Sequence, residues 1–237
     1  MSGRAVVRLL DGFSLDVESH PPAFPGALPR AAQRLVALLC LSGRADRTAV
    51  AGRLWPDVPE RCAHGSLRSA LWRLQKAAPG VVEAANGVLA LTPGVRVDVH
   101  ELVDWAQRAL DPRAEAHELT VPSVGFSGDL LPGWYDDWVL LDRERLRQLR
   151  VHALEVVAGR LAAADRPGEA LQAAYAAVRS DPLRESAYRT IVQVHLREGN
   201  AAEAIRVHDT FRTMLRSELG LEPSPQMTGL VRCLLRS

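Results

Sequence analysis

The chain has 237 residues, of which 47% are hydrophobic and 24% are charged, and its formal net charge is +1. This composition is that of a globular protein and excludes an extensively disordered chain or a fibrous repeat. The length is sufficient for one large domain or for two modest ones, each with its own core, and we start from two.

Basic and acidic residues are unevenly distributed along the chain. Residues 28–80 contain nine basic and three acidic side chains, a net charge of +6. From residue 111 onward the chain contains 16 basic and 18 acidic side chains, a net charge of −2. A basic segment beside a mildly acidic one is typical of a polyanion-binding domain joined to another domain, although an arginine-rich solvated surface gives the same counts.

The cysteines and the first residues indicate the compartment. Cys40, Cys62 and Cys233 are odd in number, far apart and without C-x-x-C spacing, which predicts a reducing environment without structural disulfides. The chain begins without the basic-then-apolar order of a signal peptide, and no uncharged apolar run is long enough to span a membrane. We therefore expect a soluble cytoplasmic protein without a membrane partner.

A β-hairpin is predicted at the start of the chain. Residues 4–18 alternate β-branched and polar positions around the Asp-Gly dipeptide at 11–12, which is a hairpin signal. A proline-rich loop follows at 21–29. Beyond it, the apolar spacing of residues 30–43 predicts a helix that stops at Gly43.

Two further helices and a second hairpin are predicted next. A short helix begins at Thr48, a possible cap, and ends before Pro56. A third helix, Ala63–Ala78, has an apolar face formed by Leu67, Ala70, Leu71, Leu74 and Ala78, and an opposite face formed by Gly65, Ser69, Trp72, Arg73 and Lys76. The Asn-Gly dipeptide at 86–87 between two β-prone runs predicts a hairpin. Strands, three helices and a terminal hairpin in this order predict a winged helix-turn-helix.

The rest of the chain is predicted to be helical. Residues 98–110 form another amphipathic helix, and the domain boundary lies in the Pro-, Gly- and Ser-containing stretch 111–133. We expect a DNA-binding domain at 1–110 and an activator domain at 111–237. In the latter, the apolar spacing over 146–161 predicts one long helix, and three more helices follow.

An internal repeat with a shift of 34 residues places Ala170 over Ala204 and Leu171 over Ile205. This is the tetratricopeptide period, although an alanine-rich helical bundle matches part of it. Such helix pairs stack on their neighbours and leave a concave surface for a partner. The expected fold class is mostly α: an N-terminal winged helix-turn-helix with a small β-sheet and a wing hairpin, followed by a tetratricopeptide-like all-α domain.

Motifs of catalysis and nucleotide binding are missing from the sequence. It contains no phosphate loop, no G-x-G-x-x-G after a strand, no H-E-x-x-H and no G-x-S-x-G. His152, His195 and His208 lie on predicted helices, but no two of them are four residues apart, so we expect no metal site. We also expect neither enzymatic activity nor a cofactor.

The third helix has the pattern of a DNA-recognition helix, with donors on one face and a buried anchor on the other. Arg73 and Lys76 supply donors for guanine edges or phosphates, while Arg44, Arg47 and the backbone at the start of the second helix supply phosphate contacts. The expected DNA-binding residues are Arg44, Arg47, Thr48, His64, Arg68, Ser69, Trp72, Arg73, Lys76 and Asn86.

Trp72 has two interpretations. We expect it at the border of the DNA interface, stacking on a sugar or contacting a thymine methyl group. The alternative is that Trp72 packs against the helical domain and that Arg68 pairs with an acidic group there. In that case the helix is a docking face for another domain.

Segments from both halves carry a family resemblance. RLVALLCLSGR, RLWPDVP and LRSALWRLQKA resemble the OmpR-like winged-helix domain, an output domain of two-component phosphorelays. The bacterial transcriptional activator domain is similar to GDLLPGWYDDWV, the RERL after it, DPLRESAYR, EGNAAEAI and LRSELGLEPSPQM. Together they resemble the SARP family (Streptomyces antibiotic regulatory proteins) over nearly the whole chain.

This resemblance implies a pathway-specific transcriptional activator. It would bind direct repeats in double-stranded promoter DNA, as a homodimer or in tandem, recruit RNA polymerase, and switch on a secondary-metabolite gene cluster, commonly one for an antibiotic. The resemblance further implies that the ATPase and sensor domains of larger relatives are absent, which leaves nothing to bind a nucleotide.

The chain departs from the family pattern at the third helix and the wing. The family usually has a small or polar residue followed by R-L-R-K, so Arg73 and Lys76 match while Trp72 and Gln75 do not. The usual wing tyrosine and arginine are absent after Gly87, which predicts weaker or less shape-selective binding. These departures leave open an interaction adaptor whose winged domain no longer recognises DNA. A small effector in the concave helical face is a third hypothesis, without a residue pattern to support it.

Overall fold

The computed structural model describes residues 5–17, 28–121 and 128–232. It contains two compact units: Met1–Glu101 with Gly128–Glu144, and Leu102–Ser127 with Arg145–Ser237. The proline-rich loop predicted at 21–29 lies largely outside the described residues. The functional domains expected at 1–110 and 111–237 stay a prediction, since the compact units interleave along the chain.

The first unit begins with the predicted hairpin. Strand β1 (Ala5–Arg8) pairs antiparallel with β2 (Ser14–Val17), and β6 (Arg96–Val97) pairs parallel with β1 on its other side. The turn uses positive φ angles at Asp11 (64°) and Gly12 (135°), which aspartate tolerates better than most residues and glycine adopts freely.

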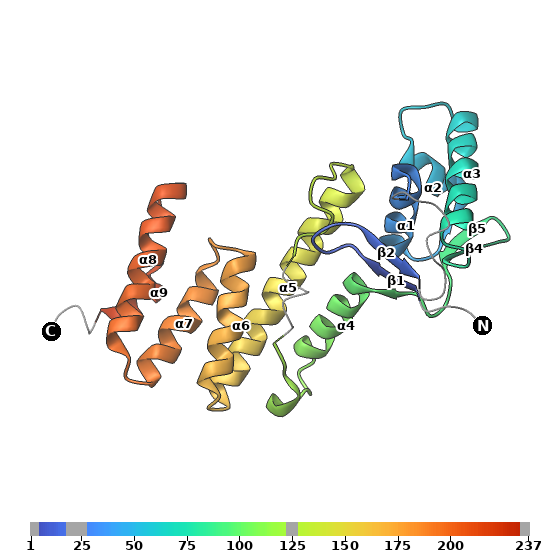
Figure 1. The fold of residues 1–237 in the computed structure, drawn as a ribbon. Coiled ribbons are helices and arrows are strands. Elements are labelled where there is room, and N and C mark those ends of the chain that lie inside the picture. Colours follow the sequence, from blue (N-terminus) through green and yellow to red (C-terminus); the bar gives the residue numbers. More distant parts are fainter. Residues whose placement is uncertain (1–4, 18–27, 122–127, 233–237) are drawn as a thin grey trace. The chain divides into compact units, whose positions relative to one another are not determined.

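The winged helix-turn-helix follows, with a three-stranded sheet in the order β3-β5-β4. Its elements are α1 (Arg30–Ser42), β3 (Ala45–Asp46), α2 (Arg47–Leu54), α3 (Glu60–Ala77), β4 (Val82–Ala85) and β5 (Val88–Leu91). Figure 1 shows β4 and β5 as a hairpin that follows α3. Helix α1 packs on α3 and β5, and α2 packs on α3, so the three helices share one core.

Two details of the helix starts differ from the sequence prediction. The prediction that Thr48 caps α2 is wrong: Oδ1 of Asp46 accepts hydrogen bonds from the backbone N–H groups of Thr48 (2.7 Å) and Ala49 (3.4 Å). Thr48 therefore lies inside the helix. Helix α3 begins at Glu60, three residues earlier than predicted, because the Pro59 carbonyl already accepts from the next turn.

A half-buried carboxylate joins the first sheet to the start of helix α4 (Asp98–Leu110). Asp98 accepts hydrogen bonds from the backbone N–H groups of Leu9 (2.9 Å to Oδ2), Leu10 (2.9 Å) and Val99 (2.7 Å). Burial raises the pKa of Asp98, and the three N–H donors oppose that shift. The carboxylate thus satisfies donors at the end of β1 and at the start of α4.

Residues 128–144 also belong to the first unit, although more than a hundred residues separate them from the opening hairpin. The Leu131 N–H donates to the Leu9 carbonyl (2.8 Å), and the Asp11 N–H donates to the Asp129 carbonyl (2.9 Å). The guanidinium of Arg143 donates to the carbonyls of Leu130, Leu131 and Trp134. This segment is therefore hydrogen-bonded to the turn that connects β1 and β2.

Trp134 fixes the same segment through its ring. The guanidinium of Arg30 at the start of α1 lies 3.5 Å from the ring centroid of Trp134, and the Phe13 ring stacks on it at 6.1 Å. Arg34, one turn after Arg30 on α1, forms an ion pair with Asp136, which is two residues after Trp134. These contacts give the GDLLPGWYDDW sequence a structural role within the first unit.

The second unit is an array of antiparallel helices. Its main helices are the later part of α5 (Asp137–Ala163), α6 (Pro167–Ser180), α7 (Glu185–Arg197), α8 (Ala201–Leu219) and α9 (Pro225–Val231), with a 3₁₀ turn at Ala116–Glu118. Helix α6 packs on α7, and α7 packs on α8 (Figure 1). The predicted 34-residue repeat is confirmed, since Ala170 and Ala204 are both fully buried, as are Ala177 and Phe211. Helix α9 was not predicted because seven residues are too few to show periodicity.

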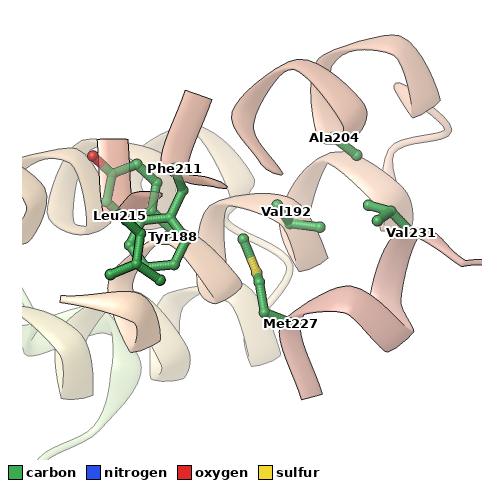
Figure 2. Close-up of a cluster of buried hydrophobic side chains, with 7 residues drawn as sticks. All are labelled: Tyr188, Val192, Ala204, Phe211, Leu215, Met227 and Val231. Carbon is green, nitrogen blue, oxygen red and sulfur yellow. The ribbon is translucent and has the colours of Figure 1, made fainter. Parts of the chain in front are cut away.

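An aromatic pair forms the core between the last helices (Figure 2). The ring centroids of Tyr188 on α7 and Phe211 on α8 are 4.6 Å apart, with the ring planes tilted by 32°. Met227 extends from α9 toward Val192, and both side chains are fully buried. Helix α9 therefore closes the end of the array by contributing apolar side chains to a core that α7 and α8 begin.

Replacing Asp98 with alanine is expected to lower the free energy of unfolding of the first unit by about 2–3 kcal/mol, because partly buried N–H donors lose a charged acceptor. Asp16→Ala on the same sheet is the matched control, since its ion pair with Arg8 is exposed and worth less than about 1 kcal/mol. Urea denaturation followed by circular dichroism measures both variants. Equal losses would contradict the role assigned to Asp98.

Replacing Phe211 with alanine is expected to destabilise the second unit by about 3–5 kcal/mol, because the substitution leaves a cavity beside Tyr188. Thr213→Ala, an exposed position on the same helix, should change the unfolding free energy by less than about 0.5 kcal/mol. The same denaturation experiment compares them, and a loss below about 1 kcal/mol for Phe211→Ala would show that the core is not packed as described.

Candidate nucleic-acid interface

Helix α3 has one buried and one exposed side, as its sequence predicts. Ala63, Leu67, Ala70 and Leu74 are buried against α1 and α2, and Leu71 is half-buried at the edge. Arg68, Ser69, Trp72, Arg73 and Lys76 are all exposed. The buried side anchors the helix, so the exposed side is held in a fixed orientation on the first unit.

We define the α3 face as the outward side of this helix, formed by Cys62, Gly65, Ser66, Ser69, Trp72, Arg73 and Lys76. Its first half carries small side chains and its second half carries large ones. Cys62 was left out of the sequence prediction because the helix was expected to begin one residue after it. Its exposure in the first turn of α3 places a free thiol on this surface.

Two of the expected residues lie on the flank of the helix. Arg68 is exposed, and its guanidinium folds back to 3.8 Å from the place that a Cβ would occupy at Gly65. His64 is half-buried, with Nε2 3.5 Å from a carboxylate oxygen of Glu60. Arg68 can therefore swing toward the α3 face, whereas His64 is directed toward the acidic start of the helix.

Trp72 and Lys76 contact each other on the α3 face. The indole of Trp72 is 58% exposed. Lys76 lies one turn further along, and its Nζ atom is 4.1 Å from the ring centroid. This distance is within the range of a cation–π interaction, which the i, i+4 spacing of the two residues favours. The pair forms a single exposed element that is both aromatic and cationic.

Arg68, Arg73 and Lys76 form no ion pair with a carboxylate of the described residues. Glu60 in the first turn is the only acidic residue between 60 and 77. The positive charge of these three side chains is therefore available to an external anion.

The start of α2 and the wing turn are held together. The Arg47 N–H donates to the Gly87 carbonyl (2.9 Å), and Asp46 pairs with Val88 between β3 and β5. Asn86 (φ 52°) and Gly87 (φ 76°) form the predicted two-residue turn, and Asn86 is exposed at its tip.

At the start of α2 the backbone N–H groups are already occupied, which leaves side chains as the free donors. The N–H groups of Thr48 and Ala49 donate to Asp46, and that of Arg47 donates to the wing. The backbone at the helix start is therefore already occupied and carries a negative cap. Arg44 is exposed before β3 and Arg47 is half-exposed on the first residue of α2, so these two guanidiniums are the candidates for contact with phosphate.

The wing itself contributes no cation. Residues 82–91 contain one charged side chain, Glu83, which is exposed. Leu89 is fully buried and Ala90 is 8% exposed. The apolar residues that replace the expected wing tyrosine and arginine therefore pack partly into the core of the domain.

The histidines noted in the sequence do not form a site. His195 and His208 are buried on α7 and α8, while His152 is exposed on α5. In the part of the chain that the structure describes, no group of three or more potential metal ligands is found. The same residues include no helix that is both long and apolar enough to span a membrane.

Comparisons with known proteins identify relatives in transcription. Residues 97–235 match the family model of the bacterial transcriptional activator domain. The regulatory protein AfsR of Streptomyces coelicolor is 29% identical over 219 residues, and AfsR of Streptomyces griseus is 29% identical over 220 residues. Both matches cover 86% of this chain and 22% of AfsR, so the chain spans about a fifth of the length of these relatives.

A solved structure shares the fold. Mycobacterium tuberculosis EmbR, in complex with a low-affinity phosphopeptide, matches with a TM-score of 0.69 over 99% of this chain and 66% of the EmbR chain, at 20% sequence identity. At this identity the likeness establishes the arrangement of the elements and no more. Because the activator-domain model matches more than half of the chain, the chain belongs to the bacterial transcriptional activator domain family.

Proposed function

We propose that this protein is a transcriptional activator that binds specific DNA sequences by inserting α3 into the major groove. The observation that carries this proposal is the α3 face, where Trp72, Arg73 and Lys76 are exposed together with no carboxylate beside them. A helix anchored on one side and cationic on the other has the width and the donors that the major groove requires.

Within this interface the residues have different roles. Arg73 is placed to pair with the two acceptors of a guanine edge, which gives sequence discrimination. Arg44 and Arg47 lie outside α3 and contact phosphates, which gives affinity and register without discrimination. Thr48, His64, Arg68, Ser69 and Asn86 border these contacts from α2, the flank of α3 and the wing turn.

The partners that we propose for this protein are inferred from its membership in the activator-domain family. We propose that the protein acts in the cytoplasm on direct repeats near a promoter, with two copies on the DNA, and that it recruits RNA polymerase to a secondary-metabolite gene cluster, such as one for an antibiotic. Membership in the activator-domain family and the match to AfsR support this proposal. The tetratricopeptide-like array of the second unit supplies helical surface for a protein partner.

A second candidate function is that of an interaction adaptor. The observation that favours it is the wing, which carries Glu83 and no basic residue, so the winged domain lacks a wing cation that would enter the minor groove. Capture of a stable partner by the full chain, together with DNA affinity no greater than that of a generic basic protein, would establish the adaptor in place of the activator.

Replacing Arg73 with alanine is expected to weaken binding to a promoter fragment from the gene's own cluster by about 1–3 kcal/mol, the range for a good base contact. A gel-shift titration at two salt concentrations measures it. Arg179→Ala, which removes an exposed arginine from α6, controls for charge and should leave affinity unchanged. If wild type and Arg73→Ala bind alike, the winged domain is a scaffold.

Replacing Arg47 with alanine is expected to weaken binding to the promoter fragment and to a random duplex by the same factor. Because one phosphate contact is lost, the slope of log affinity against log salt should become shallower by about one. Fluorescence anisotropy over a salt series measures both quantities. A loss confined to the promoter would instead assign Arg47 to base recognition.

A further inference from the structure

We propose that Trp72 determines part of the sequence preference by contacting the C5 methyl group of a thymine in the major groove. This inference rests on DNA binding by α3 and goes beyond it, because it assigns one base and one atom to a residue that departs from the family pattern.

Trp72 is exposed among cations. A tryptophan side chain buries 150–250 Å² when it packs, in typical proteins, yet here the indole is 58% exposed. Ser69, Arg73 and Lys76 surround it on the α3 face and favour a polyanion as the partner. On the base edges of the major groove, the apolar group is the thymine methyl. Among the base edges, a thymine therefore offers the apolar contact that complements the ring, beside the phosphates that complement the cations.

Lys76 lies over one face of the Trp72 indole. Its Nζ atom lies 4.1 Å from the ring centroid, so one face of the ring is already covered. Insertion between two stacked bases needs both faces of an aromatic ring, and this arrangement disfavours it. Trp72 is nevertheless 58% exposed, and a contact with the part of the ring that Lys76 leaves uncovered suits a methyl group that projects from the base into the groove.

The first half of the α3 face carries the small residues Gly65, Ser66 and Ser69. The Arg68 guanidinium lies over this half, 3.8 Å from the place of a Cβ at Gly65, so the helix backbone can approach the floor of the groove once Arg68 turns away from Gly65. The Ser69 hydroxyl donates to the Gly65 carbonyl at 3.1 Å and is therefore satisfied within the helix. Trp72 is the first large side chain beyond this low surface, which places its ring at the depth of the base edges.

The experiment begins with selection of duplexes from a random pool by the full-length protein. In the enriched sequence each thymine is then replaced, one at a time, by deoxyuridine, which removes only the C5 methyl group. Affinities of wild type, Trp72→Ala and Trp72→Phe are measured on every duplex by fluorescence anisotropy. Tyr135→Ala is the matched control, since Tyr135 is an aromatic residue outside α3 that is 80% exposed.

The expected result is one thymine per half-site whose replacement weakens wild-type binding about fourfold, the effect of one buried methyl group. Tyr135→Ala should show the same fourfold loss at that position. Trp72→Ala should bind the thymine and deoxyuridine duplexes equally, and Trp72→Phe should keep part of the difference. Circular dichroism confirms that each variant is folded, and the wild-type comparison does not depend on any variant.

Two results would overturn the proposal while leaving DNA binding by α3 intact. One is an enriched sequence in which no thymine replacement affects wild type. The other is a Trp72→Ala variant that keeps the full thymine preference, or that loses affinity equally on all duplexes, which would assign Trp72 to a sugar or phosphate contact. If selection enriches no sequence, the proposed function itself fails and this inference fails with it.

Discussion

The burial of the apolar side of α3 is the constraint on which the candidate interface depends. Leu67, Ala70 and Leu74 are nearly inaccessible, and a rotation of the helix by one residue would bring a charged or polar side chain into their place. With 100° between successive residues, fixing these three positions also fixes the direction of Trp72 and its basic neighbours. The packing of the core therefore determines which residues of α3 are exposed. After Glu60 the helix has no carboxylate of its own that could pair with the exposed cations.

Much of this arrangement could be predicted from the sequence because its signals are local. The Asn-Gly turn, the stop at Gly43 and the apolar spacing of α3 each lie within a few residues of the feature that they predict. The cap of α2 was assigned wrongly because Asp46 and Thr48 both have side chains that cap helices, and only the folded geometry shows which one accepts the N–H groups. The sequence also contains no local signal that Leu131 would bond to Leu9, since that contact depends on the fold of the whole first unit.

The candidate site was predicted less completely than the fold. Periodicity places Trp72 and Arg73 outward, but the contact of Lys76 with the indole depends on a rotamer that periodicity does not specify. The occupation of the first N–H groups of α2 by Asp46 and by the Gly87 carbonyl was likewise hidden. This matters for function, because a helix start that is already capped contributes less to phosphate binding than an open one.

The distribution of charge decides how such a domain would discriminate between sequences. In the proposed function, the arginines outside α3 would supply affinity for any duplex, and the wing, with Glu83 as its one charged residue, offers no cation for a minor-groove contact. Discrimination between sequences would then fall on a few side chains of α3. A guanidinium alone distinguishes guanine by its acceptors, and it leaves adjacent positions unspecified. An exposed indole beside it adds an apolar contact of the kind that hydrogen-bond donors cannot make. A wing without a basic residue and an exposed Trp72 thus favour the same mode of recognition, in which sequence preference comes from base edges rather than from groove shape.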